Sequence, residues 1–259
     1  MLSEENERKI NELRQRRDEF RKNSDVFTSE EFYAYVREKA FSKPNYTPEM
    51  LKSFGIAEEN IPTFLDKEKE NNARTFKYFF DQVNQKAPYS TDLTRRMHEE
   101  LMDGLIYGAG SYRSARAMLA STAIIPPNYV KIPFIMAQLE ADVNTLEKRT
   151  LDTALHIHYT ILTTQPFSDA NKRTARLMMN LYLMERGYPP IFVEKEDKRE
   201  YLSSMEEKFV KSDENRYYSF MLDLLKHSFD DVSQMSNVKI KHKDNLPLVI
   251  VNSNQHVKN

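Results

Sequence analysis

The sequence predicts an all-α fold, in which a helical domain carries a small β-hairpin flap and follows an N-terminal helical extension. Apolar residues recur at three- and four-residue spacing along much of the chain, which is typical of amphipathic helices. Several of these stretches are preceded by helix-start signals. Strong strand signals are confined to residues 113–125 and 246–251.

The predicted elements follow in chain order. Residues 3–22 are highly charged with few apolar positions, which predicts a solvated helix or arm. Thr28 or Ser29 before two glutamates marks a helix start, and Thr47 before a proline marks another. The helices predicted after residue 22 span 30–40, a short segment from 48, 58–84, 91–105, 132–146, 150–164, 169–186, 197–210 and 214–229.

Three parts are predicted along the chain. Residues 1–85 form the N-terminal helical extension, residues 86–235 the main domain and residues 236–259 a tail with a short strand. Residues 239–245 are expected to be a polar linker into that tail.

The composition excludes several classes of protein. The 38 basic and 39 acidic residues nearly cancel, so nothing favours nucleic acid globally and an anion site must be local. The absence of cysteine excludes a disulfide scaffold and thiolate chemistry. No apolar run is long enough for a membrane helix and the first 30 residues are not signal-like, so we expect a cytoplasmic protein.

Charged and amide side chains gather between Gln165 and Arg176, where a proline indicates a turn before a helix. The first amides of such a helix are unpaired and attract anions. Arg173 and Arg176 fall on one helix face, and two guanidiniums suit a polyphosphate. Asp169 would hold a magnesium ion that bridges phosphate oxygens. The alternative is a charged surface helix capped by Asp169.

The run Gln165-Pro-Phe-Ser-Asp-Ala-Asn-Lys-Arg173 resembles the signature of the Fic/Doc family, H-x-F-x-[DE]-[AG]-N-[GK]-R. The similarity extends over about residues 88 to 230. Upstream, the stretch from Gly108 to Arg113 and the Pro-Pro pair at 126–127 are similar to the family's flap. Downstream, Gly187-Tyr-Pro-Pro resembles its turn after the motif helix. The chain departs from the family at Gln165, where the catalytic base is normally histidine.

The resemblance implies a transferase that moves AMP, or phosphate, from Mg-ATP to a protein hydroxyl. Its implied cofactors are ATP and Mg²⁺. Its implied partner is a protein that docks on the flap at about 113–125 by strand addition, with no nucleic acid, no membrane and the oligomeric state left open. The implied catalytic residues are Gln165, Asp169, Asn171 and Arg173, with Asp169 as the metal ligand. The implied nucleotide-binding residues are Ser168, Asp169, Ala170, Asn171, Lys172, Arg173 and Arg176. Lys172 replaces the more usual glycine, which leaves AMP and phosphate transfer both open.

The loss of the base predicts impaired activity. An amide does not exchange protons near neutral pH, and general-base catalysis is worth on the order of 10²–10⁴ in rate. His156 and His158 are the nearest histidines, but His158 lies about 10 Å back along the helix, so we expect packing roles for both. Phosphoryl transfer needs little activation of the nucleophile, so slow transfer remains expected. The alternatives are a nucleotide-binding pseudoenzyme and a scaffold that binds no nucleotide.

A second, partial resemblance concerns inhibition. Many Fic-like proteins carry a helix with the pattern [ST]-x-x-x-E-[GN], and Asp66-Lys-Glu-Lys-Glu70-Asn71 matches its last two positions. The resemblance implies that Glu70 pairs with Arg176. The alternative is a solvated face of a charged helix.

Overall fold

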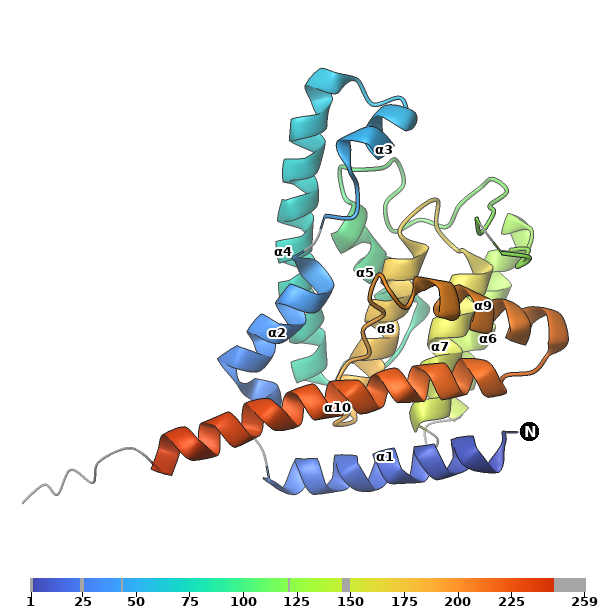
Figure 1. Ribbon diagram of the computed structural model, residues 1–259. Coiled ribbons are helices and arrows are strands. Elements are labelled where there is room, and N and C mark those ends of the chain that lie inside the picture. Colours follow the sequence, from blue (N-terminus) through green and yellow to red (C-terminus); the bar gives the residue numbers. More distant parts are fainter. Residues whose placement is uncertain (1, 24–25, 43, 121, 146–149, 245–259) are drawn as a thin grey trace, which may run out of the picture.

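The computed structural model describes residues 2–23, 26–42, 44–120, 122–145 and 150–244 (Figure 1). Within these ranges the regular elements are all helical and no strand is present, which confirms the all-α prediction. The α-helices are α1 (Glu4–Asn23), α2 (Glu30–Phe41), α3 (Pro48–Ser53), α4 (Ile61–Gln85), α5 (Thr91–Met102), α6 (Ile132–Thr145), α7 (Thr150–Thr164), α8 (Asn171–Glu185), α9 (Lys198–Lys211) and α10 (Asn215–Asp244). The short 3₁₀ helices are η1 (Val26–Thr28), η2 (Glu58–Asn60) and η3 (Tyr129–Lys131).

Helices α7 and α8 form the centre of the molecule. They pack directly on each other, and α4, α5 and α6 surround them (Figure 1). Every residue of α8 from Leu177 to Met184 is buried, because this helix is enclosed on nearly all sides. The loop that joins the two helices carries the predicted motif, so the core fixes it at both ends.

The end of α8 confirms the predicted glycine stop. Gly187 adopts a left-handed φ of +82°, and the backbone N–H of Tyr188 donates to the carbonyl of Leu183 at 3.0 Å. A Cβ at Gly187 would also lie 2.7 Å from Cδ of Arg21. Any other residue here would therefore be strained and would push the Arg21 side chain aside.

Helix α1 is more than a solvated arm, because it lies along α10 (Figure 1). Ile10 and Leu13 are buried. Ion pairs between Lys9 and Asp223 at 2.7 Å and between Arg16 and Asp230 at 2.7 Å flank the seam. The first helix is thus bound to the last described helix.

The N-terminal extension also reaches the motif. Aromatic rings join α2 to α4, with the centroids of Tyr33 and Phe80 4.4 Å apart and those of Phe41 and Phe76 5.5 Å apart. Helix α4 in turn packs on α5 and α8. Residues 44–46 belong to the segment that joins α2 to α4. The packing of these two helices therefore places residues 44–46 beside the start of α8.

The predicted β-hairpin at 113–125 does not form in the described residues of that segment. A two-stranded hairpin is marginal without a third strand or a covering helix. Instead, side chains form hydrogen bonds with some of the backbone groups of this segment. Arg113 donates to the carbonyl of Ala115, and the N–H of Ala123 donates to Glu206 of α9 at 2.6 Å. The flap is an irregular loop, anchored at both ends.

The predicted linker at 239–245 is also wrong, because α10 continues to Asp244. The sequence contains no glycine or proline between residue 230 and Pro247, so nothing in it stops the helix earlier. The predicted strand at 246–251 lies outside the described residues. Among the described helices, none combines the length and the apolar content that crossing a bilayer requires.

We predict that Arg113 is the main anchor of the flap. Its buried guanidinium donates to the carbonyls of Gln165 at 2.6 Å, Pro127 at 2.7 Å and Thr164 at 3.3 Å. Arg113→Gln leaves buried carbonyls unpaired and should lower the free energy of unfolding by about 3 kcal/mol in urea denaturation. The exposed Arg116→Gln is the matched control, expected within about 0.5 kcal/mol of wild type. Equal stabilities would contradict the anchoring role.

Candidate phosphate-binding site

Two residues with a left-handed backbone conformation and one pair of side-chain hydrogen bonds shape the loop between α7 and α8. Gln165 has a φ of 47° and Ala170 a φ of 56°, so the chain turns sharply at both ends of the loop. The carboxamide of Asn171 clamps Phe167, since its Oδ1 accepts from the Phe167 N–H and its Nδ2 donates to the Phe167 carbonyl, both at 2.8 Å. Phe167 itself is fully buried.

This clamp changes the role expected for Asn171. Its side chain was predicted to hold phosphate, but both of its polar atoms are committed to the loop. Asn171 therefore shapes the loop, and only its backbone N–H, not its side-chain amide, is left for an anion.

Helix α8 starts at Asn171, slightly later than predicted. Its N-cap is Ala170, which has no side chain to accept from the first amides. Asp169 does not cap the helix either, because its Oδ1 accepts from the N–H of Ala170, one residue before the helix. The first amides of α8 therefore remain available, which favours an anion at this helix start.

His98 of α5 supports the loop from behind. Its ring stacks on Phe167 with centroids 3.9 Å apart and planes within 7°. The N–H of Gly110 donates to Nδ1 at 2.9 Å, so Nε2 carries the proton and donates to the Asp169 carbonyl at 3.2 Å. Burial lowers the pKa of His98 to about 4, which keeps the ring neutral. The sequence contains no spacing signal that links residue 98 to the motif.

Asp169 and Arg173 meet at Tyr46, which comes from the N-terminal extension. The Tyr46 hydroxyl donates to Oδ2 of Asp169 at 2.6 Å and accepts from Nη2 of Arg173 at 3.0 Å. Burial raises the pKa of Tyr46, so it stays a neutral donor. The phenol thus occupies the carboxylate and the guanidinium that were predicted to hold Mg²⁺ and phosphate.

Glu68 of α4 is the second contact from the extension. Its side chain is buried, accepts from the backbone and side-chain nitrogens of Asn45 at 2.9 Å each, and lies 3.7 Å from Nη1 of Arg173. That Nη1 is buried and makes no hydrogen bond among the described residues. The expected contact between Glu70 and Arg176 is absent, because the Glu70 side chain is 72% exposed and faces Lys67.

That correction has a simple geometric cause. Glu68 and Glu70 lie two residues apart on one helix, so they point about 200° apart around its axis. Both glutamates stand in the same run of charged residues, so the sequence does not distinguish them. Only the packing of α4 shows which of the two faces the core.

A hollow of about 350 Å³ collects the remaining predicted residues. Tyr46 and Asn45 line one side and the exposed Met118 of the flap lies at its rim. From the motif it is lined by Gln165, Ser168, Asp169, Ala170, Asn171, Lys172, Arg173 and Arg176. The structure therefore brings together all of the predicted site residues.

The side chain of Gln165 is held by the end of α7. Its Nε2 donates to the carbonyl of Leu162 at 2.6 Å, and the residue is 8% exposed. No described histidine replaces it. Both nitrogens of His98 are engaged, one with Gly110 and one with Asp169. His158 is fully buried between Tyr201 and Tyr217, at 2.8 Å from each hydroxyl.

The other histidine predictions are confirmed. Burial lowers the pKa of His158 to about 3, which is consistent with a neutral packing residue. His156 lies 3.3 Å from Asp142 of α6, away from the motif. Neither side chain is placed to take a proton at the hollow.

The donor set fits magnesium only together with a phosphate ligand. The described residues contain no cluster of three metal-ligating side chains. Asp169 is the carboxylate at the hollow, and Mg²⁺ is commonly held by one or two carboxylates plus substrate phosphates. Asp169 would hold such an ion once the Tyr46 hydroxyl leaves Oδ2.

The fold thus places a clamped loop, followed by an uncapped helix start, between its two central helices. Residues 88–183 match the model of the Fic/DOC family. The chain is 32% identical over 98 residues to protein adenylyltransferase fic-1 of Caenorhabditis briggsae, and 36% identical over 80 residues to protein adenylyltransferase Fic of Drosophila melanogaster. These alignments cover 38% and 30% of this chain, but only 19% and 16% of the relatives.

Solved structures agree on the fold. Fic-1 (residues 134–508) from Caenorhabditis elegans matches with a TM-score of 0.64 and 21% identity, over 92% of this chain and 73% of that one. A Fic domain containing signaling protein from Bacteroides thetaiotaomicron matches with a TM-score of 0.61 and 18% identity, over 91% and 98%. The chain thus contains a Fic/DOC family domain at residues 88–183.

We predict that His98 resists protonation. Its pKa of about 4 in the folded protein lies below the roughly 6.5 of an unfolded chain. Between these values the unfolded chain binds the extra proton, so this contribution to stability is complete above pH 6.5 and is lost as pH falls toward 4. The shift corresponds to about 3 kcal/mol at most.

Nitrogen NMR at pH 5.5, with the signal assigned by His98→Gln, should show a neutral ring protonated at Nε2. A doubly protonated His98 ring at that pH would contradict this assignment.

Proposed function

We propose that this chain is a Fic-type transferase that moves AMP from Mg-ATP to a protein hydroxyl, at a rate reduced by the missing base. The observation that carries the proposal is the hollow in which Asp169, Arg173, Arg176 and the uncapped start of α8 converge. The similarity to named protein adenylyltransferases supports the same activity.

Each group at the hollow has its own role in this proposal. The backbone N–H groups at the start of α8 hold a phosphate, and Arg173 and Arg176 bind the more distal ones. Asp169 would hold Mg²⁺, which would supply charge neutralisation at the phosphates. Asn171 and His98 keep the loop in shape.

In the transfer, the oxygen of the target hydroxyl bonds to the α-phosphorus, pyrophosphate leaves and the hydroxyl proton is released. Because Gln165 accepts no proton, that proton goes to solvent. Positioning and charge neutralisation then provide the acceleration. Transfer of the terminal phosphate would use the same groups, and Lys172, exposed at the hollow, is the residue that distinguishes this motif from the more usual glycine form.

The second candidate is a nucleotide-binding regulatory pseudoenzyme. Two observations favour it over rapid catalysis. The side chain of Gln165 is bonded to its own helix, and Tyr46 with Glu68 holds the charged groups of the motif. In this state the protein would restrain its own nucleotide site.

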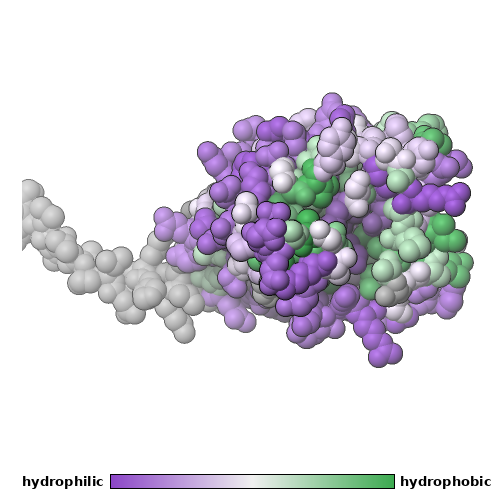
Figure 2. Space-filling model, turned by 90° about the horizontal axis from the view of Figure 1, so that it is seen from above, coloured by the Kyte–Doolittle hydropathy of each residue, from purple (hydrophilic) through white to green (hydrophobic). Residues whose placement is uncertain are grey.

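The protein partner is proposed to dock on the flap. The flap exposes Met118 (88%) and Ile125 (77%), and Figure 2 shows apolar patches in green among the purple hydrophilic surface at this end of the molecule. The backbone groups of the loop that Arg113 and Glu206 do not occupy would be available to an extended peptide.

We predict that Gln165→His restores the base. Transfer should rise by about 10²–10⁴, while nucleotide affinity changes little, because a base acts on the chemical step more than on ground-state binding. Mass spectrometry of protein incubated with Mg-ATP and a cell lysate measures the added AMP or phosphate. Gln165→Asn keeps an amide and is the matched control. Unchanged labelling in a folded Gln165→His variant that binds nucleotide would show that the imidazole is not the missing element.

We predict that Tyr46→Phe strengthens binding of Mg-ATP. The change removes the hydroxyl from Asp169 and Arg173 while the ring stays in place. A hydrogen bond to a charged group is worth about 1.5–3 kcal/mol, so the affinity should rise about tenfold or more in calorimetry.

Tyr35→Phe is the control for this change, because Tyr35 also donates to a carboxylate, Asp231 at 2.8 Å, away from the motif. Arg173→Ala should abolish the gain. Equal affinities of the Tyr46→Phe, Tyr35→Phe and wild-type proteins would contradict the restraint.

A further inference from the structure

Three exposed apolar side chains line the hollow beside the motif. Met50 lies in α3, Phe54 is the C-cap residue of that helix, and Met118 belongs to the flap. The three residues are 40%, 62% and 88% exposed, in the same order. We call these three residues the apolar rim. Because they face solvent, a molecule that enters the hollow from outside passes them.

Helix α3 holds its part of the rim firmly. At the start of the helix, Oγ1 of Thr47 accepts from the N–H of Met50 at 3.3 Å. At its end, the N–H of Ile56 donates to the carbonyl of Leu51 at 3.0 Å, which closes the helix, and the Leu51 side chain is buried. Met50 and Phe54 are four residues apart and therefore lie on one helix face. The exposed apolar face thus belongs to a capped and anchored helix.

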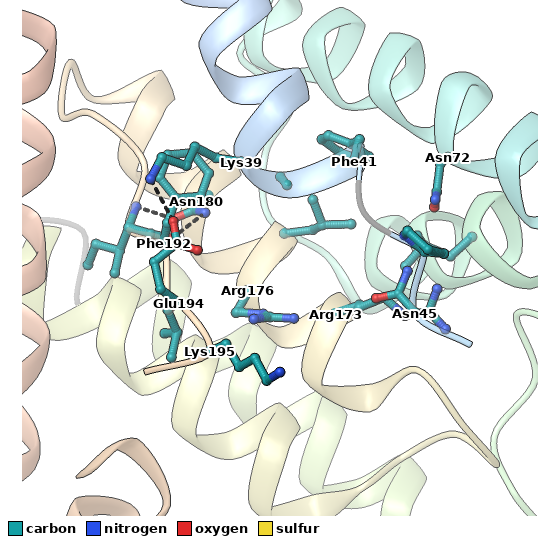
Figure 3. A pocket seen from close by; sticks show the side chains of 16 residues that line it. Lys39, Phe41, Asn45, Asn72, Arg173, Arg176, Asn180, Phe192, Glu194 and Lys195 are labelled. Carbon is teal, nitrogen blue, oxygen red and sulfur yellow. Dashed lines mark hydrogen bonds and ion pairs between the residues drawn. The ribbon is translucent and has the colours of Figure 1, made fainter. Parts of the chain in front are cut away.

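A neighbouring space of about 200 Å³, which Arg173 and Arg176 also line, has a different border (Figure 3). Figure 3 shows the charged side chains of Lys39, Glu194 and Lys195 around it. Among the described residues, none of the large apolar side chains that are exposed lines this space. Of the two spaces, the hollow is thus the one with an apolar rim in the part of the chain that the structure describes.

The size of the hollow indicates which part of a target reaches this rim. In an extended peptide, side chains two positions apart point to the same side and lie about 7 Å apart. A hollow of about 350 Å³ would be roughly 9 Å across if it were spherical, so side chains two positions from an inserted hydroxyl reach its rim. The residues directly beside the hydroxyl point the other way.

We propose that the apolar rim selects target segments that carry a large apolar side chain two positions from the acceptor hydroxyl. That side chain packs on Met50 and Phe54 or on Met118. The inference rests on the proposed transfer function and adds the class of target sequence to it. Burial of a leucine-sized side chain at the rim should favour such targets by about tenfold.

The first experiment measures transfer to short peptides by the full chain, as wild type and as Gln165→His. Each peptide has a central serine, threonine or tyrosine and either leucine or glutamine two positions away on both sides. With Mg-ATP, mass spectrometry should give a kcat/KM about tenfold higher for the leucine peptides.

A matched pair of variants tests the rim itself in the Gln165→His background. Phe54→Ser should reduce the preference for leucine to less than about threefold, because the ring that packs on the leucine is removed. Phe209→Ser, which changes an exposed phenylalanine of α9 that does not line the hollow, should retain the preference. Equal kcat/KM for leucine and glutamine peptides, or an unaltered preference in Phe54→Ser, would overturn the proposal.

Nucleotide affinity distinguishes a target contact from a nucleotide contact. Phe54→Ser should bind Mg-ATP within about twofold of the parent protein in calorimetry, because the rim lies at the opening and the phosphates bind at the start of α8. A loss of about tenfold or more would place the nucleotide base on the rim and overturn the proposal.

Peptide binding without transfer separates this inference from the proposed function. The methyl signals of Met50 and Met118, assigned with Met50→Leu and Met118→Leu, are followed by NMR while each peptide is added. They should shift with the leucine peptides and not with the glutamine peptides. If no peptide gains AMP or phosphate, even with Gln165→His, the transfer function is contradicted, whereas shifts of these methyl groups still support the rim. Absence of the shifts would overturn the inference.

Discussion

The candidate site depends on the pair of hydrogen bonds between the Asn171 side chain and the backbone of Phe167. That clamp closes the loop between α7 and α8, and the stacked ring of His98 holds it from the core side. Because both supports are buried, the start of α8 is fixed without a side-chain cap. An anion can then bind to preorganised amides, with little cost of ordering the loop.

A second set of contacts opposes this preorganisation. Tyr46 bonds both Asp169 and Arg173, and Glu68 lies against the same guanidinium. These groups come from the N-terminal extension, which the aromatic contacts between α2 and α4 hold in place. The structure therefore combines a helix start with free amides and an intramolecular occupant of the charged groups beside it. Nucleotide binding and release of Tyr46 are accordingly expected to be coupled.

The sequence predicted the elements that depend on local signals. Periodic apolar residues and caps located the helices, and Gly187 ended α8 as expected. It could not predict what depends on packing. Nothing local separates Glu68 from Glu70, or shows that Asn171 faces its own loop instead of a ligand. The segment at 113–125 does not form a hairpin in its described residues, and Arg113 and Glu206 instead bond the carbonyl of Ala115 and the N–H of Ala123. Motif residues were found because they are contiguous, whereas Tyr46 and His98 reach the site from distant segments.

The most direct test is a crystal structure of the protein with Mg²⁺ and a non-hydrolysable ATP analogue. The account predicts phosphate oxygens on the first N–H groups of α8 and on Arg173, a metal ion on Asp169 and the Tyr46 hydroxyl displaced from both side chains. The Asn171–Phe167 clamp should be unchanged. A nucleotide bound elsewhere, with the contacts of Tyr46 to Asp169 and Arg173 intact, would contradict it.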